Sequence, residues 1–150
     1  MSLLARLEQE YIAAYKAKDT VRLNVLRLLK TALKHFQVER LHPPTDDDVL
    51  DIIARQCKQR QDSIDQFRAA GRPELVEKES AEMRILLSYM PAPFSDEELA
   101  SAIADAIAAV QAAGMKDMGR VMQALTAAHK GRFDGKTASE AVKAALQASA

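Results

Sequence analysis

Apolar residues recur at intervals of three and four positions along nearly the whole chain, and no segment alternates apolar and polar residues as a half-buried strand does. This spacing predicts amphipathic helices over residues 2–18 and 20–39. The apolar stripe of the first is Leu4, Leu7, Tyr11, Ala14 and Tyr15, and that of the second is Val25, Leu26, Leu29, Leu33 and Phe36. The pattern therefore predicts an all-α protein.

Prolines, glycines and capping residues divide the pattern further. Pro43–Pro44 ends the second helix, because proline cannot continue the hydrogen-bond ladder. Thr45 and the three aspartates after it predict the start of a third helix, which runs to Gly71. The centre of that helix, Lys58–Ser63, is polar on every side, so we expect it to project beyond the core or to meet a partner. A fourth helix is predicted over residues 73–89.

The segment Met90–Phe94 contains two prolines and is the strongest linker signal in the chain, with a capping box beginning at Ser95 directly after it. Beyond this point the composition becomes rich in alanine, and shorter apolar stripes predict three more helices, the last two separated by the turn Lys130–Lys136. We therefore predict an N-terminal multihelical domain of about four helices, residues 1–93. A small three-helix C-terminal domain, residues 94–150, follows it.

Charge and targeting signals narrow the classes of function. The 21 basic and 21 acidic residues give a net charge of zero, so binding to nucleic acid would require a local basic patch. The start of the chain resembles neither a signal peptide nor a transit peptide, and no apolar run reaches the ~20 residues that span a bilayer. We therefore expect a cytoplasmic protein without membrane contact.

Motifs of catalysis and cofactor binding are absent from the sequence: it contains no Walker P-loop, GxGxxG, GxSxG or HExxH. We expect no catalytic residue, no metal and no cofactor. Two alternatives stay open. Cys57 could form a nucleophile pair with His35, although a small buried residue at the margin of the core is the favoured interpretation. The aspartates Asp46–Asp48 could bind a cation, although compensation of the helix dipole is favoured.

Two groups of basic residues are candidates for contact with an anionic partner. Arg27, Lys30 and Lys34 share one face of the second helix, as they also would on any solvated surface. The segment Lys116–Lys136 contains five Lys or Arg and two Asp, a local charge of +3, and its glycines allow close backbone approach. We expect its basic residues to form one cationic corner, with Phe133 offering a ring for stacking. The alternative is an ordinary turn that Phe133 anchors to the core.

Several stretches resemble the YqeY family over essentially the whole chain. They are Val25–Lys34, Lys58–Ser63, Ala70–Arg72, Tyr89–Pro91, Lys116–Met122 and Lys130–Lys136. Proteins of that family resemble the C-terminal tail of GatB, a subunit of the glutamine-dependent tRNA amidotransferase, and that tail is implied to hold the tRNA. Carried over residue by residue, the resemblance assigns a nucleic-acid-binding role to Lys116, Gly119, Arg120, Lys130, Gly131, Arg132, Gly135 and Lys136.

The resemblance implies a non-catalytic tRNA-binding or amidotransferase-associated accessory module, with tRNA and proteins of translation or amidotransfer as the expected partners. The family's link to carbon–nitrogen ligase activity with glutamine as amido-N-donor is inherited from the larger enzyme, whose catalytic parts this sequence lacks. The alternative is a helical protein–protein adaptor without RNA contact. A stand-alone amidotransferase is disfavoured, because the sequence has neither a nucleotide site nor a nucleophile constellation.

Overall fold

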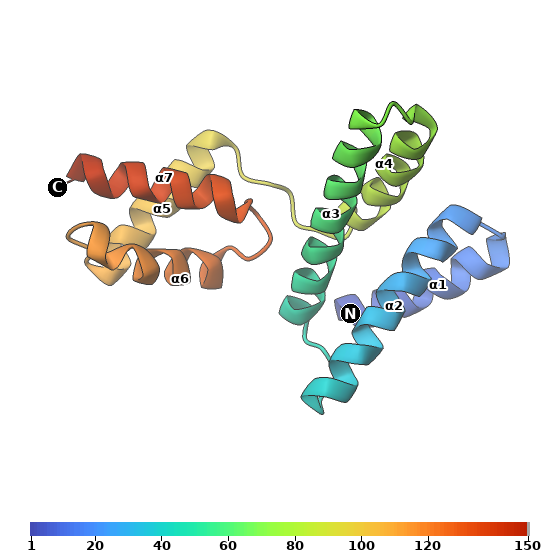
Figure 1. Ribbon diagram of the computed structural model, residues 1–150. Helices are drawn as coiled ribbons and strands as arrows, with labels where there is room; N and C mark the ends of the chain where they lie inside the picture. The colour runs from blue at the N-terminus through green and yellow to red at the C-terminus, as the bar shows by residue number, and fades with distance from the viewer. Residues whose placement is uncertain (150) are drawn as a thin grey trace. The chain divides into compact units, whose positions relative to one another are not determined.

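The computed structural model describes residues 1–149, and this part of the chain is all-α, without a β-strand (Figure 1). The predicted fold class is thus confirmed. The α-helices are α1 (Leu3–Ala17), α2 (Thr20–Arg40), α3 (Asp46–Ala69), α4 (Pro73–Leu87), α5 (Asp96–Val110), α6 (Met118–Ala128) and α7 (Gly135–Ser149), and a short 3-10 helix, η1 (Met115–Asp117), precedes α6. The chain divides into two compact units, Met1–Met90 and Pro91–Ala150, so the boundary falls three residues before the predicted one.

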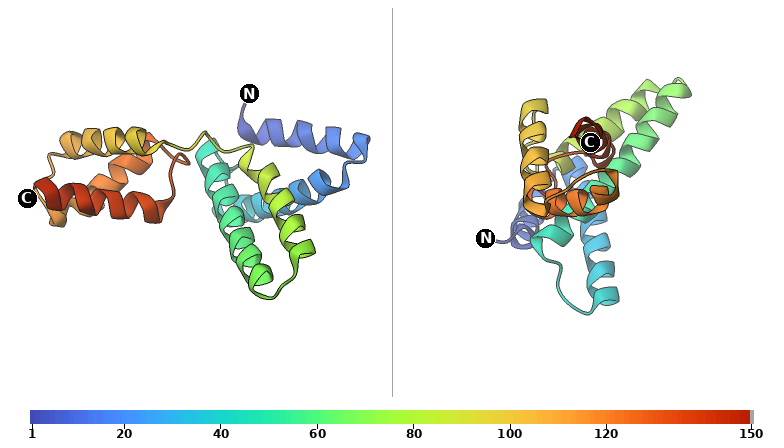
Figure 2. Two further views of the ribbon diagram at one scale, coloured as in Figure 1. Left: turned by 90° about the horizontal axis from the view of Figure 1, so that it is seen from above. Right: turned by 90° about the vertical axis from the view of Figure 1, so that its left-hand side faces the viewer.

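The first unit is built from two helical hairpins, α1 with α2 and α3 with α4 (Figures 1 and 2). Its core contains most of the apolar stripe residues that the sequence indicates, with Leu7, Leu29 and Ile53 among the side chains almost entirely removed from solvent. Phe36, at the end of the second predicted stripe, is only half-buried and lies outside this core cluster. Tyr15 departs from the predicted stripe. It stands in the last turn of α1, beyond the buried Ala14, and is 63% exposed.

The sequence predicted that the polar centre of α3, Lys58–Ser63, projects beyond the core or meets a partner. In the structure, part of this segment packs against α4. Arg60 is buried, because α4 packs along α3 and brings two glutamates against it. Its Nη1 atom lies 3.1 Å from Glu79 Oε2 and also donates to Glu82 Oε2. Lys58, Gln59, Gln61 and Asp62 are exposed, so Arg60 is the one buried residue of this stretch. The prediction of a projecting segment was therefore wrong at Arg60.

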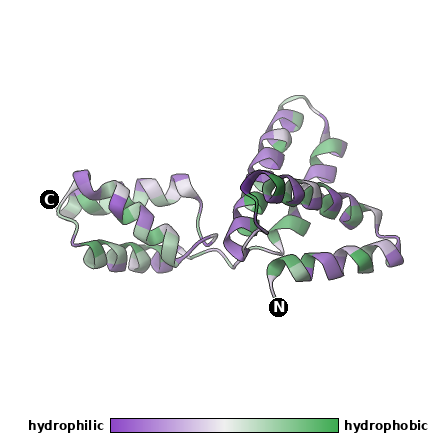
Figure 3. Ribbon diagram, turned by 90° about the horizontal axis from the view of Figure 1, so that it is seen from below, coloured by the Kyte–Doolittle hydropathy of each residue, from purple (hydrophilic) through white to green (hydrophobic). Residues whose placement is uncertain are grey.

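The second unit packs α5, α6 and α7 around one apolar core, in which Val121, Leu125, Val142 and Leu146 are almost completely buried. Apolar and polar residues alternate around its helices as in amphipathic helices generally (Figure 3). The capping box predicted at the start of α5 is present: Ser95 Oγ accepts from the Glu98 amide, and the Glu98 carboxylate accepts from the Ser95 amide. These contacts satisfy amides that the helix itself leaves without a partner.

The segment after Pro91 is attached to the second unit. Arg132 Nε donates to the carbonyl of Ala92 at 2.8 Å, and the Phe94 amide donates to the carbonyl of Arg132 at 2.7 Å. The predicted linker Met90–Phe94 includes the last residue of the first unit, Met90, and its later residues belong to the second unit.

Within residues 1–149, no single helix combines the length and hydropathy needed to cross a membrane. Taken together, α5 and the segment Met115–Ala128 have the length and composition that a membrane-spanning segment needs. The two are bent by 94° at the break between them.

Candidate nucleic-acid interface

The first half of the predicted basic segment is organised by a carboxylate. Asp117 ends η1 and is buried, and its Oδ2 atom accepts a hydrogen bond from the Ala113 amide at 2.8 Å. Its Oδ1 atom accepts from Arg120 Nη1 at 3.1 Å. The Ala113 hydrogen bond, followed by the hydrogen bond and charge of Arg120, lowers the pKa of Asp117. Asp117 therefore joins the loop after α5 to the first turn of α6.

Arg120 has a structural role in addition to the predicted binding role. While Nη1 contacts Asp117, Nη2 donates to the carbonyl of Val110 at 2.5 Å and so satisfies a carbonyl at the end of α5. Its charge is thereby partly neutralised, although the side chain is still 58% exposed. Gly119, also in the first turn of α6, has open space where a Cβ would stand.

The second half of the segment is the turn His129–Lys136, which is held by Arg132. The Arg132 guanidinium donates to the Ala92 carbonyl, lies 4.3 Å from the centre of the Phe94 ring and 3.9 Å from Glu98 Oε2. The Phe94 ring is also in edge contact with His129. These contacts from a cation, an aromatic ring and the backbone fix the turn against the segment before α5.

Two further residues show why the turn has this shape. Gly131 has a φ of 80°, a left-handed conformation that glycine adopts without a steric penalty. Asp134 Oδ2 accepts from the Thr137 amide at 3.0 Å and caps α7, which begins at Gly135, within the predicted turn Lys130–Lys136. Phe133 is half-buried and packs against the core of this unit, so the anchoring alternative is supported over an exposed stacking ring.

The predicted basic residues do not form one corner. Lys116 lies in η1, and Gly119 and Arg120 lie in the first turn of α6, whereas Lys130 and the residues after it follow the end of α6. The helix has 11 residues, so its ends are separated by about 16 Å. The single cationic corner is thus corrected to two groups, because an ordered helix separates positions that are near one another in sequence.

The second predicted basic face, on α2, is also partly neutralised. Lys30 Nζ lies 3.3 Å from Glu8 Oε1 and 4.1 Å from the centre of the Tyr11 ring, both on α1. Arg27 and Lys34 are exposed on the same helix. Lys30 therefore joins α1 to α2, and this face carries less free charge than its sequence suggests.

The two open alternatives for chemistry are answered by burial and by capping. Cys57 is buried and desolvation raises the pKa of its thiol, whereas His35 is exposed, which does not suit an activated nucleophile pair. Asp48 forms a capping box with Thr45, and Asp46 Oδ1 accepts from the Leu3 amide at 2.9 Å. In the part of the chain that the structure describes, no three His, Cys, Asp or Glu side chains are grouped to hold a metal ion.

Comparison with known proteins supplies the family. A family model described as a YqeY-like protein matches residues 4–146. The chain belongs to this family. The match covers both units of this YqeY-like chain, including the α5–η1–α6 junction and the turn before α7. It confirms the resemblance drawn from the sequence.

Curated relatives of this YqeY-like chain are named "Altered inheritance of mitochondria protein 41, mitochondrial". The relative from Eremothecium gossypii is 37% identical over 69% of this chain and 57% of its own length. That from Kluyveromyces lactis is 36% identical over 59% of this chain and 49% of its own length, and that from Pyrenophora tritici-repentis is 28% identical over 87% and 72%. The chain thus spans only about half of the length of the first two.

These names contradict the cytoplasmic location expected from the sequence. The relatives are described as mitochondrial proteins, and the expectation depended only on the lack of a recognisable targeting signal. The lack of a recognisable targeting signal does not by itself indicate which compartment contains the protein. The prediction of a cytoplasmic location was therefore wrong and is withdrawn.

Proposed function

We propose that this YqeY-like chain is a non-catalytic, tRNA-binding accessory module, and that the turn His129–Lys136 makes the main phosphate contact. The observation that carries the proposal is the concentration of cations on a turn of fixed shape. Lys130, Arg132 and Lys136 lie within seven residues, and the acid among them, Asp134, is used to cap α7. Basic side chains on an ordered backbone suit the phosphates of a folded RNA.

The structure suggests a division of roles among these cations. Arg132 positions the turn through its contacts with Ala92 and Phe94, and is half-buried. Lys130 and Lys136 are then the residues proposed to contact phosphates, because a lysine ammonium is a mobile point charge that does not require a planar partner. Lys116, in η1 before the other end of α6, is proposed to contact a second phosphate group of the same RNA. Contacts of this kind read the shape of the RNA rather than its bases.

Titration of fluorescently labelled tRNA against the whole chain, at several salt concentrations, tests this proposal. Replacement of Lys130 and Lys136 together by alanine is expected to weaken binding and to reduce the slope of log affinity against log salt by about 1.8, or about 0.9 for each phosphate contact. The matched control replaces Lys78 and Lys143, exposed lysines of α4 and α7, and should leave most of the affinity. Equal affinity of the turn variant and the unchanged chain would exclude the turn.

The accessory part of the proposal concerns amidotransfer. We propose that the chain delivers or holds tRNA for a glutamine-dependent tRNA amidotransferase and supplies no chemistry itself. This is supported by family membership and by the thiol of Cys57, which is buried and hard to ionise. Assays with misacylated tRNA should show no glutamine-dependent amide formation by the chain alone, and an altered rate when it is added to the purified amidotransferase. Amide formation by the chain alone would refute the non-catalytic role.

The second candidate is the helical protein–protein adaptor. One observation favours it: the second unit has an apolar groove on its surface between α5 and α7.

A further inference from the structure

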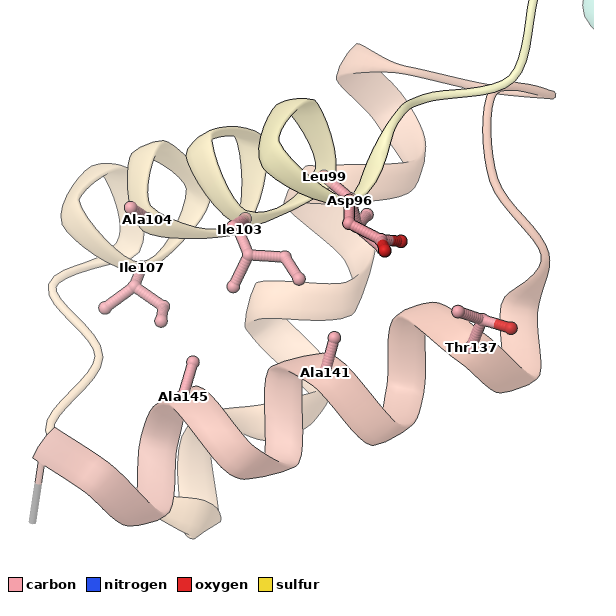
Figure 4. A pocket seen from close by; sticks show the side chains of 9 residues that line it. Asp96, Leu99, Ile103, Ala104, Ile107, Thr137, Ala141 and Ala145 are labelled. Atoms are coloured by element: carbon pink, nitrogen blue, oxygen red, sulfur yellow. The ribbon is translucent and has the colours of Figure 1, made fainter.

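The groove between α5 and α7 has a volume of about 500 Å³, and its lining shares no residue with the basic turn, although Thr137 at one end directly follows Lys136 (Figure 4). The two helices run in the same direction, with Asp96 beside Thr137 at one end and Ile107 beside Ala145 at the other. Nearly all of its lining is apolar: Leu99, Ala100, Ile103, Ala104, Ile107, Ala141 and Ala145. An apolar trough on a helical surface is the receptor half of helix-in-groove recognition.

The size of the groove fits a helix. Its α5 wall extends from Asp96 to Ile107, about 16 Å or three helical turns. On both walls, alanines recur four positions apart: Ala100 with Ala104, and Ala141 with Ala145. Short side chains on both sides leave space for the larger apolar residues of an incoming helix, spaced three and four positions apart. A helix seated there would extend the three-helix unit to a four-helix bundle.

The charges around the groove indicate the character of the occupant. The two helices that form the groove, α5 and α7, carry five acidic residues, Asp96, Glu97, Glu98, Asp105 and Glu140, and two lysines, Lys136 and Lys143. Their balance is therefore acidic, although Glu98 lies 3.9 Å from Arg132. Asp96 is the one charged residue of the lining, and Glu140 is exposed on α7, three positions after Thr137. This surface repels phosphates and attracts basic side chains. An RNA is therefore disfavoured here, and a positively charged partner is favoured.

We propose that the α5–α7 groove is a docking site for a basic amphipathic helix of a partner protein. The apolar face of that helix fills the trough along Ile103, Ile107 and Ala141. Its lysines or arginines lie beside the acids at the Asp96 end. The groove shares no lining residue with the turn His129–Lys136, and the proposal does not depend on the function proposed for that turn.

The test uses a synthetic helical peptide of about 18 residues, with leucines at i, i+3, i+4 and i+7 and lysines elsewhere. A peptide of the same composition, with its leucines distributed around the helix, is the control for non-specific attraction. Binding of each labelled peptide to the whole chain is measured by fluorescence anisotropy, and its location is mapped from amide chemical shifts. The amphipathic peptide should bind and should shift amides of α5 and α7, while the control peptide should do neither.

Two kinds of substitution distinguish loss of peptide binding caused by a filled groove from loss caused by an added positive charge. Ala141→Trp fills it without a charge and Ala141→Arg adds one, and both should weaken peptide binding at least about tenfold. Ala100→Arg, at an exposed position on the other wall, repeats the test where folding is not at risk. The matched controls Ala127→Trp and Ala127→Arg, on the exposed face of α6, should change binding less than about twofold.

Three outcomes would overturn the proposal. Binding that Ala141→Arg weakens but Ala141→Trp leaves intact would be general attraction to an acidic surface. Shifts confined to other helices would place the peptide elsewhere. A dimer in analytical ultracentrifugation that Ala100→Arg converts to monomer would show that a second copy of this chain occupies the groove.

Discussion

Arg60 of α3 donates a hydrogen bond to Glu82 of α4, with both side chains only about a tenth exposed. Glu79, one turn before Glu82, lies 3.1 Å from the same guanidinium nitrogen. One cation is thus shared between two carboxylates at the interface of the second hairpin. Because each charge there has lost most of its water, the cluster is sensitive to the loss of any one member.

Replacement of Arg60 by methionine should destabilise the first unit by about 3 kcal/mol, because two acids then remain at the interface without their cation. The Arg60→Met, Glu82→Leu double variant should recover part of this loss, since it removes a stranded carboxylate and adds apolar contact. Urea unfolding followed by circular dichroism measures both. Arg68→Met, at a position with 67% side-chain exposure, is the control and should stay within about 0.5 kcal/mol. Equal stability of Arg60→Met and Arg68→Met would contradict this account.

Much of the helical architecture could be predicted, because periodicity, prolines and caps all agreed. The capping box at Ser95 is present, Thr45 caps the start of α3, and α4 begins at Pro73 as expected. The partners of polar residues inside interfaces could not be predicted. Nothing local marks Arg60 as buried, since its burial depends on how α4 lies along α3, a relation between segments about twenty residues apart.

The basic residues of the candidate interface show the same limitation. Composition identifies them, but it does not distinguish a side chain available to a ligand from one already used by the fold. Arg120 is bound to Asp117, and Arg132 to Ala92. One signal was available in the sequence, because Asp117 stands three positions before Arg120, a spacing that brings side chains together on one helical turn. No comparable local signal connects Arg132 to Ala92, forty residues away.

Gly131 and Gly135 provide a matched pair for testing the turn. Gly131→Ala should cost about 1–2 kcal/mol, because its φ of 80° lies in the left-handed region that side chains with a Cβ disfavour. Gly135→Ala should be neutral or stabilising by up to about 1 kcal/mol, since this residue starts α7 and has open space around it. Thermal unfolding of both variants measures the difference. A Gly135→Ala variant less stable than Gly131→Ala would refute the explanation.

Asp117 should contribute to the acid limb of the stability profile. Its pKa is lower in the folded state than in the unfolded chain, where aspartate titrates near pH 4. The stabilisation is therefore present above about pH 4 and is lost as the pH falls through the lowered native value. Asp117→Asn should melt at a lower temperature than the unchanged chain at neutral pH, and the two curves should converge in strong acid. A temperature difference that grows as the pH falls would have the wrong sign.

The pKa of Asp117 depends on two partners, the Ala113 amide and the Arg120 guanidinium, which contribute unequally. The Ala113 amide is the larger cause of the lowered pKa, and the hydrogen bond and charge of Arg120 are smaller ones. Arg120→Met should therefore raise the pKa of Asp117 without restoring it to its unfolded value. Carbon-13 titration of the Asp117 carboxyl group measures this directly. A pKa left unchanged by Arg120→Met would show that the ion pair has no part in holding η1 to α6.

Cys57 should be almost unreactive in the folded protein. The thiolate is the reactive species, and burial raises the pKa of this thiol even though Arg60 opposes the shift. Reaction with an aromatic disulfide reagent at neutral pH should therefore be slow and should require opening of the helices around it, while the denatured chain should react rapidly. Arg60→Met, which loosens the contact between α3 and α4, should accelerate the reaction by increasing the open population. Rapid labelling of the unchanged native protein would show an accessible, ionised thiol and would reopen the possibility of nucleophilic chemistry at Cys57.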